Sequence, residues 1–439
     1  MRYQIPITFF VRTEKNCFTN ATDGQEPLST EKNCMKRFIT LLGLCCTSFL
    51  YFSCSKDGTI SGSPSGYTGG AMYSAGGGSG SGSGGAGGGS SNPGDTAKAG
   101  RMTAGEWNDL DNWNFWKGLM NKDTLRGYQS VWGFYPSNRI SIVLRDASGQ
   151  LVHDAKLTAT QGSASATAIT DNFGKADLFP GLFQSNYNAS GNFSLKAEYR
   201  GQTFDLGVVG TSETPVSKTI PVAKLASATL DVMFVVDATG SMGDEISYLK
   251  TEIKDVINRA GGQLPGTNIR MGSVFYRDNG DEYVTRPFNF TSDVNQLTNF
   301  INNQQAGGGG DTPEAVDQGL DVAVNQLQWS SSAVNRIMFL ILDAPSHKSQ
   351  DVLDKLRNAV VTAQKKGIRI IPVSASGIDH ETEFLLRFLS ISTSSTYVFI
   401  TNHSGIGGPH LEPTVGNYEV EYLNNLMVRL ISKYGKNMN

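Results

Sequence analysis

The chain has 439 residues, of which 39% are hydrophobic and 18% are charged, and its formal net charge is −3. This length is enough for two or three domains with cores of their own, and the near-neutral charge argues against a nucleic-acid partner. All the cysteines lie at or before Cys54. A disulfide framework, a thiolate zinc cluster and a cysteine nucleophile are therefore excluded in the rest of the chain.

The first 54 residues have the pattern of a targeting sequence. Residues 1–34 are mostly polar, and we expect them to be a non-native extension before a true start at Met35. Residues 35–53 begin with basic side chains and continue with an apolar stretch that is short for a membrane span but typical of a signal peptide. A plain secretion or anchor signal is one interpretation of this stretch.

The end of that stretch resembles the processing site of bacterial lipoproteins, because a small residue, Ser53, precedes Cys54. Tyr51 departs from the pattern, which usually has an aliphatic residue there. The resemblance implies cleavage before Cys54, lipid attachment to Cys54, and an outer-membrane lipoprotein of the bacterial cell envelope. The resemblance does not determine on which face of the membrane the protein is displayed.

Residues 54–102 are rich in Gly and Ser. Such a composition has too few apolar side chains to offset the entropy lost on ordering, so we expect a disordered tether. Its central part, Ser55 to Gly100, is a flexible chain of 46 residues with a root-mean-square reach of about 35–40 Å. A lipid anchor followed by this tether would hold folded domains clear of a membrane.

Residues 103–135 are predicted to be a tryptophan-rich helical docking segment. Thr103 and Glu106 have the spacing of a capping box at a helix N-terminus. Apolar residues then recur every three or four positions: Trp107, Leu110, Trp113, Trp116, Leu119 and Met120. We expect this stripe to pack a helix onto a neighbouring domain, and an exposed platform for carbohydrate or lipid is the alternative.

Residues 136–226 are predicted to form a small all-β domain. About seven short stretches of alternating polarity, separated by turn residues, indicate an antiparallel sandwich. The pattern around Asp146 and Asp171 resembles the carboxypeptidase-regulatory-like, transthyretin-like sandwich modules of extracytoplasmic proteins. Asp146, Asp171 and Asp177 have the chemistry to bind calcium, but turn and hairpin roles are favoured.

Residues 227–439 alternate between apolar runs and amphipathic stretches. The runs at 232–236, 337–342 and 368–373 are typical of strands buried on both faces. Helices are predicted at 242–260, 292–304, 314–328, 349–366, 379–390 and 417–435. This alternation predicts an α/β doubly wound, mostly parallel sheet, in which ligands bind at the carboxyl ends of the strands.

Oxygen-bearing side chains follow the first of these strands. Asp237, Thr239 and Ser241 are spaced two residues apart, so that one turn can direct three oxygens at a hard cation such as Mg²⁺. The sequence here resembles the von Willebrand factor A domain and its metal-ion-dependent adhesion site. The family motif is Asp-x-Ser/Thr-x-Ser, with a Thr in a later loop, matched by Thr312, and an Asp after a later strand, matched by Asp343.

The resemblance implies a site for Mg²⁺, or for Mn²⁺ or Ca²⁺. Asp278 and Asp311 are candidate accessory carboxylates, and ordinary loop carboxylates are the alternative. Simpler interpretations remain for each ligand. Ser241 and Thr312 have the positions of helix N-caps, and Asp237 and Asp343 those of turn residues at strand ends. The four glycines at 307–310 would let their loop approach the site closely. His403 and His410 flank a loop on the same edge and would shape the choice of partner.

Two carboxylates leave a divalent cation short of negative charge if one of them reaches it through water. A carboxylate from a protein partner can then take an open position, as in adhesion members of the family. We find no phosphate loop, dinucleotide fingerprint, zinc-protease motif or nucleophile elbow. We therefore expect a non-catalytic, membrane-anchored envelope protein that binds a protein with an acidic residue. The alternatives are an envelope scaffold with a structural metal, and carbohydrate or lipid binding through the tryptophans and the sandwich.

Overall fold

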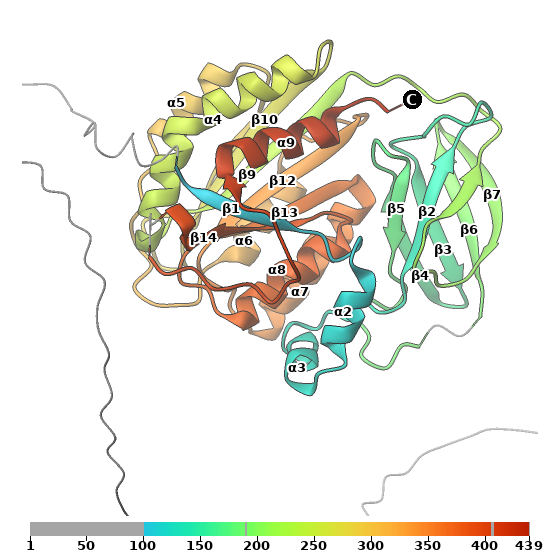
Figure 1. Cartoon of the computed structure of the whole chain (residues 1–439), viewed down its shortest axis with the longest axis horizontal. Coiled ribbons are helices and arrows are strands. Elements are labelled where there is room, and N and C mark those ends of the chain that lie inside the picture. Colours follow the sequence, from blue (N-terminus) through green and yellow to red (C-terminus); the bar gives the residue numbers. More distant parts are fainter. Residues whose placement is uncertain (1–100, 189–190, 405–407, 439) are drawn as a thin grey trace, which may run out of the picture. The chain divides into compact units, whose positions relative to one another are not determined.

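The computed structural model describes residues 101–188, 191–404 and 408–438 (Figure 1). The predicted extension, signal peptide, lipid-bearing Cys54 and most of the tether lie outside these residues. None of the helices in the described part of the chain is both long and apolar enough to cross a bilayer.

A mixed eight-stranded sheet with the order β11-β10-β9-β12-β13-β14-β1-β15 forms the larger domain. Five adjacent strands are parallel: β10 (Asn268–Tyr276), β9 (Thr229–Asp237), β12 (Asn335–Leu342), β13 (Ile368–Ser374) and β14 (Tyr397–Thr401). The antiparallel strands are β11 (Thr285–Thr291), β1 (Thr103–Trp107) and β15 (Glu421–Tyr422). The prediction of a mostly parallel α/β sheet is confirmed.

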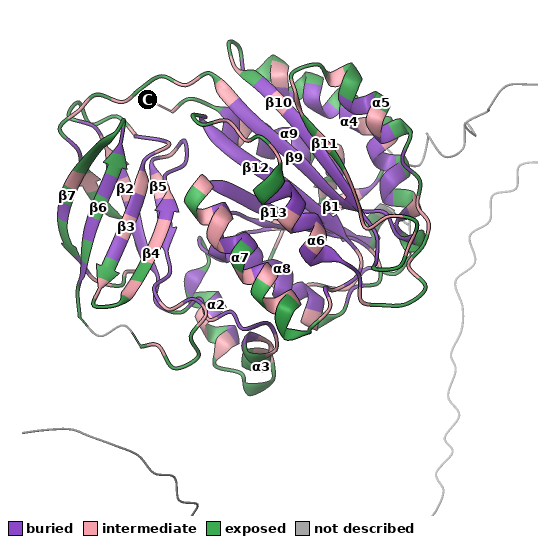
Figure 2. Cartoon of the chain, turned by 180° about the vertical axis from the view of Figure 1, so that it is seen from behind, coloured by how far each residue is buried: buried purple, intermediate pink, exposed green. Residues whose placement is uncertain are grey.

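Helices cover both faces of this sheet (Figures 1 and 2). Val232 and Phe234 of β9 belong to one apolar core, with α4 (Gly243–Gln263), α5 (Val294–Asn302) and α9 (Leu423–Gly435). Met233 and Val235 belong to the opposite core, with α6 (Val316–Asp321), α7 (Gln350–Lys366) and α8 (His380–Ser392). Because strand side chains alternate between faces, a run apolar at every position requires this two-sided cover.

Two predicted helices are shorter in the structure than in the sequence pattern. The stretch 314–328 gives the short α6 and then a π-helical turn at Val322–Gln326. The stretch 417–435 becomes helical only at Leu423, because Glu421 and Tyr422 pair with β1 in the sheet.

The predicted helix start at Thr103 is wrong. Residues Thr103–Trp107 form β1, which lies between β14 and β15 and pairs antiparallel with both. Pairing with two neighbouring strands gives hydrogen-bond partners to more backbone N–H and C=O groups than a helix cap can. It also buries Ala104 and Trp107. Helices follow at α2 (Trp113–Met120) and α3 (Asp123–Trp132).

The tryptophans of this segment pack against the α/β domain. The Trp116 ring lies 5.9 Å from the ring of Phe384 and 5.7 Å from that of Phe388, both on α8. Trp107, Trp113, Trp116 and Trp132 are all at least nine-tenths buried. Buried rings cannot stack on a carbohydrate or enter a lipid layer, so the alternative of an exposed tryptophan platform is wrong.

The small β-domain has two sheets. One has the order β5-β2-β8, with β2 (Ile140–Arg145), β5 (Lys175–Leu178) and β8 (Val216–Thr219). The other has the order β4-β3-β6-β7, with β3 (Lys156–Gln161), β4 (Ala164–Ile169), β6 (Phe193–Tyr199) and β7 (Gln202–Val209). The fully antiparallel prediction is wrong at one pair, because β8 crosses to the other sheet and runs parallel to β2.

The three sandwich aspartates have structural roles. Asp146 accepts backbone N–H groups of Ser148 and Gln150 in its turn. Asp171 does the same for Phe173 and Lys175. Asp177 pairs with Arg139.

The sandwich lies between two pieces of one α/β domain. Strand β1 precedes the sandwich in the chain and β9 follows it, yet both belong to the same sheet. A buried amide pair joins the sandwich to this domain, since Asn335 of β12 donates to Asn172 at 2.8 Å. The α/β domain therefore includes residues well before 227.

Candidate metal centre

The turn after β9 holds a buried carboxylate. Asp237 is the last residue of that strand, and its Oδ1 accepts the backbone N–H of Thr239 at 2.9 Å and the Thr239 hydroxyl at 2.8 Å. The other oxygen, Oδ2, is buried and makes no hydrogen bond of good geometry among the described residues, although the buried Tyr276 hydroxyl lies near enough to lower the pKa of Asp237. An unpaired buried carboxylate oxygen is costly, which marks this position as one that a ligand would complete.

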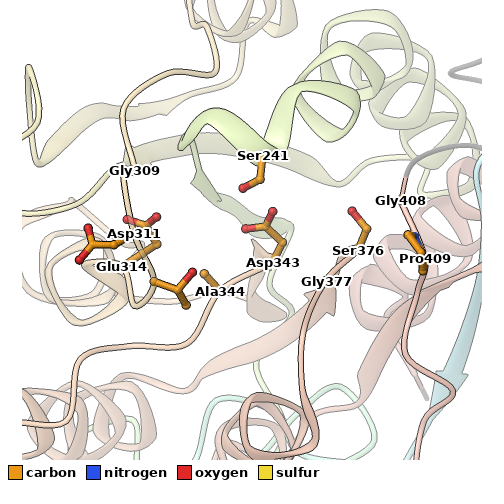
Figure 3. A pocket seen from close by; sticks show the side chains of 12 residues that line it. Ser241, Gly309, Asp311, Glu314, Asp343, Ala344, Ser376, Gly377, Gly408 and Pro409 are labelled. Atoms are coloured by element: carbon orange, nitrogen blue, oxygen red, sulfur yellow. The ribbon is translucent and has the colours of Figure 1, made fainter.

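Ser241, Thr312 and Asp343 line a single cavity of about 430 Å³ at the carboxyl ends of β9 and β12. In Figure 3 the Ser241 hydroxyl and the Asp343 carboxylate face each other across it. The remaining wall is formed by Gly309, Gly310, Asp311, Glu314, Ala344, Ser376, Gly377, Gly408 and Pro409. Asp237 adjoins this group, since its Oδ1 accepts from Thr239, and Thr239 lies directly against Gly309 of the cavity wall.

The electrostatics of the site favour a positive charge. Burial first, and then the nearby Asp343, raise the pKa of Asp237 to about 7, against the lowering effect of hydrogen bonds from Thr239. Burial also raises the pKa of Asp343, although a hydrogen bond from Ser241 lowers it. Asp343 Oδ1 has no hydrogen-bond partner in the described structure. Buried carboxylates that lie close together are stabilised when they bind a proton or a cation. The set of oxygen donors therefore fits a hard divalent metal.

The glycine-rich loop is fixed against the Asp237 turn. Gly307 N donates to Ala238 O at 3.0 Å, and Gly240 N donates to Gly308 O at 3.1 Å. Gly309 has a φ of 63°, and a Cβ there would lie 2.6 Å from Thr239 Cβ. Only glycine permits this approach.

Arg277 holds the same two segments together. Its side chain donates from Nε to Ala238 O at 3.1 Å and from Nη2 to Gln305 O at 2.9 Å. The Asp237 turn and the start of the glycine-rich loop are therefore positioned by one buried guanidinium.

Neither hydroxyl caps a helix. Ser241 lies in a 3₁₀ turn, Gly240–Met242, and α4 begins after it without a side-chain cap. Thr312 precedes a cis peptide bond to Pro313, and α6 begins only at Val316 with Ala315 at its N-cap. The N-cap interpretations of both residues are therefore wrong.

The other predicted residues are placed differently. Asp278 does not line the cavity, and its Oδ1 lies 2.7 Å from His347 Nε2. Asp311 is exposed on the cavity wall. His410 is buried and bonded to Asn402, and burial lowers its pKa, so its ring offers a partner little surface. His403 is exposed but is not among the residues lining the cavity.

Two buried glutamates were not found from the sequence. The pKa of Glu314 is raised to about 8, by burial first and then by Asp237, Asp278, Asp281 and Asp343. That of Glu245, on α4, is raised to about 7, mainly by burial. Glu314 follows Thr312 by two positions, which was the available signal. In the described residues, no three Asp, Glu, His or Cys side chains are close enough to hold a metal by themselves, so a metal here depends on the hydroxyls.

Comparison with known proteins assigns the larger domain. Residues 231–406 match the family model of the von Willebrand factor type A domain. A putative ariadne-like RING finger protein of Acanthamoeba polyphaga mimivirus is 33% identical over 137 residues, which are 31% of this chain and 13% of that protein. The alpha-protein kinase vwkA of Dictyostelium discoideum is 31% identical over 127 residues, 28% of this chain and 20% of the kinase. The chain thus spans a fifth or less of the length of these relatives.

Solved structures with a partial likeness include two named proteins. Proximal thread matrix protein 1 of the mussel byssus, in a structure described as having a zinc-occupied MIDAS motif, is 17% identical with a TM-score of 0.32, and the match covers 47% of this chain and 46% of that one. BatB of Bacteroides thetaiotaomicron is 15% identical with a TM-score of 0.24, over 48% of this chain and 87% of that one.

Proposed function

We propose that this chain, whose residues 231–406 form a von Willebrand factor type A domain, binds a protein partner through a divalent cation. One observation carries the proposal. Ser241, Thr312 and Asp343 come from three separate loops and line one cavity, next to Asp237 with its buried and unpaired Oδ2. A bound cation would give these four side chains a common partner.

Each residue has a distinct part in this proposal. Asp237 and Asp343 supply negative charge, and the hydroxyls of Thr239, Ser241 and Thr312 supply neutral oxygens. We propose Mg²⁺ as the cation, with Mn²⁺ or Ca²⁺ as alternatives that accept the same ligand types. The cation, when bound, supplies a positive centre for an acidic side chain of the partner. The role proposed for the site is binding and not catalysis.

The cellular setting is proposed from the sequence of residues 35–54. A lipid on Cys54 would attach the protein to the outer membrane of a bacterial envelope, and residues 54–102 would serve as the tether. Thr103 pairs with Thr401 at the carboxyl end of β14. The α/β domain thus begins at the carboxyl ends of the parallel strands, which is the end of the sheet that carries the cavity.

The test compares the native chain with its Asp237→Asn variant. We expect Mg²⁺ to raise the melting temperature of the native chain in titrations from an EDTA-treated state, and to leave the variant unchanged. Affinity capture from envelope extracts should retain a partner in Mg²⁺ but not in EDTA. Equal capture under both conditions, with the thermal shift intact, would favour the alternative of a scaffold with a structural metal.

A further inference from the structure

The cavity that carries the candidate metal site has charge of one sign. Three carboxylates, Asp311, Glu314 and Asp343, are among its lining residues, and no Lys, Arg or His is among them.

Basic side chains near the cavity are already engaged. Arg277 donates to two backbone carbonyls and pairs with Glu282. His347 pairs with Asp278, and Lys348 pairs with Glu381. The carboxylates of the cavity wall are therefore not neutralised by these groups.

Glu314 and Asp311 are the two carboxylates that the proposed ligand set does not use. Glu314 is 3% exposed, and its Oε2 is buried without a hydrogen-bond partner in the described part of the chain. Its backbone N donates to Pro345 O at 2.9 Å, which ties it to the loop that begins with Asp343. Asp311 is exposed on the same wall, where it forms no ion pair with another described residue.

These two groups change the charge balance of the site. Asp237 and Asp343 together match the charge of a divalent cation, so the exposed Asp311 leaves the loaded cavity negative. A negative wall strengthens cation binding but repels an acid that approaches the cation, because both effects follow Coulomb's law at short range. Interfaces usually resolve such a mismatch by placing the opposite charge on the partner.

We propose that the partner segment carries a basic side chain directly beside the acid that reaches the cation, and that Asp311 and Glu314 receive this basic side chain. The inference rests on the proposed function and specifies the chemistry of the partner. Asp311 makes the direct ion pair because it is exposed, and Glu314 offers its buried, unpartnered Oε2 as an acceptor at the same wall.

The test uses two capped peptides, Gly-Glu-Ala-Gly and Gly-Glu-Lys-Gly, titrated into the full chain at saturating Mg²⁺ by calorimetry. We expect the Lys peptide to bind up to about fivefold more tightly, the upper end of what one exposed ion pair provides. This preference should fall to within about twofold in Asp311→Asn and should shrink in Glu314→Gln. The control Glu198→Gln removes one exposed carboxylate from the sandwich strand β6 and should keep the full preference.

The possible failures are distinguishable. Equal affinity of the two peptides in the native chain, with both requiring Mg²⁺, would overturn this inference and leave the proposed function standing. A preference that persists in both Asp311→Asn and Glu314→Gln would also overturn it. If neither peptide binds better in Mg²⁺ than in EDTA, the proposed function fails, and this inference fails with it.

Discussion

Asp109 accepts two hydrogen bonds from the guanidinium of Arg387, at 2.9 Å from Nε and 2.6 Å from Nη2. Both side chains are buried, and Arg387 also donates to Glu383 and to the backbone carbonyl of Thr414. Trp107 at the end of β1 completes the group by donating to Asp109. This network joins the tryptophan segment before the sandwich to helix α8 far beyond it.

Removing the carboxylate of Asp109 should destabilise the whole α/β domain. Asp109→Ala leaves Arg387 buried with one acidic partner instead of two, and we expect a loss of about 3–5 kcal/mol in the free energy of unfolding. Urea denaturation measures this. Asp111→Ala is the matched control, because Asp111 pairs with Lys175 near the surface, and it should cost no more than about 1 kcal/mol. Equal losses for the two variants would contradict the network's importance.

Neutralising Asp237 should separate metal binding from folding. Burial disfavours the charged form of Asp237 and raises its pKa to about 7, so Asp237→Asn should leave the metal-free melting temperature unchanged or higher at pH 8. The same variant should lose the Mg²⁺-dependent rise in melting temperature. Asp311→Asn, which removes an exposed carboxylate from the same wall, should keep that rise. A metal-free Asp237→Asn protein that melts much earlier would show a structural role instead.

Arg277 should control the order of the glycine-rich loop. Arg277→Ala removes donors to Ala238 O and Gln305 O, and we expect it to cost about 1–3 kcal/mol. Hydrogen exchange should accelerate at residues 305–310 more than elsewhere. Arg286→Ala removes a neighbouring, partly exposed guanidinium that also lies over the Tyr283 ring, and it should leave that exchange unchanged. Uniform acceleration in both variants would argue against a specific clamp.

The parts of this structure that could be predicted are those specified by local pattern. The apolar run before Asp237 identifies a strand buried on both faces, and the spacing of Asp237, Thr239 and Ser241 identifies the turn after it. Thr312 and Asp343 follow from the family motif and from the meeting of parallel strand ends at one edge of a sheet. The structure places all these residues at one cavity or beside it.

What could not be predicted depends on distant pairing and burial. The capping-box spacing at Thr103 is a genuine local signal, but β14 and β15 offer that segment backbone partners about 300 residues away. Glu314 looks like an ordinary carboxylate at a helix start. Only the packing of its loop against Pro345 shows that it is buried beside Asp237.

His153 should make the sandwich junction sensitive to acid. It is buried, and burial is the main reason that its pKa lies below the ordinary value of 6.5. Asp154 raises the pKa, and Lys224 and Arg336 lower it. Because the folded state binds the proton less well than the unfolded state, this stabilisation is complete above about pH 6.5 and is lost as the pH falls below it.

The measurement is the free energy of unfolding in urea as a function of pH, in EDTA, for the native chain and for His153→Gln. Asp237, Glu245 and Glu314 act in the opposite direction, since their raised pKa values make the metal-free fold less stable as the pH rises from about 4 towards 7–8. The difference between the two curves cancels those contributions and isolates His153. We expect the native chain to lose more stability than His153→Gln between pH 6.5 and the folded pKa of His153. The curve for His403→Gln, which changes an exposed histidine, should run parallel to the native curve. If the curve for His153→Gln also runs parallel to the native one, protonation of His153 does not destabilise the fold.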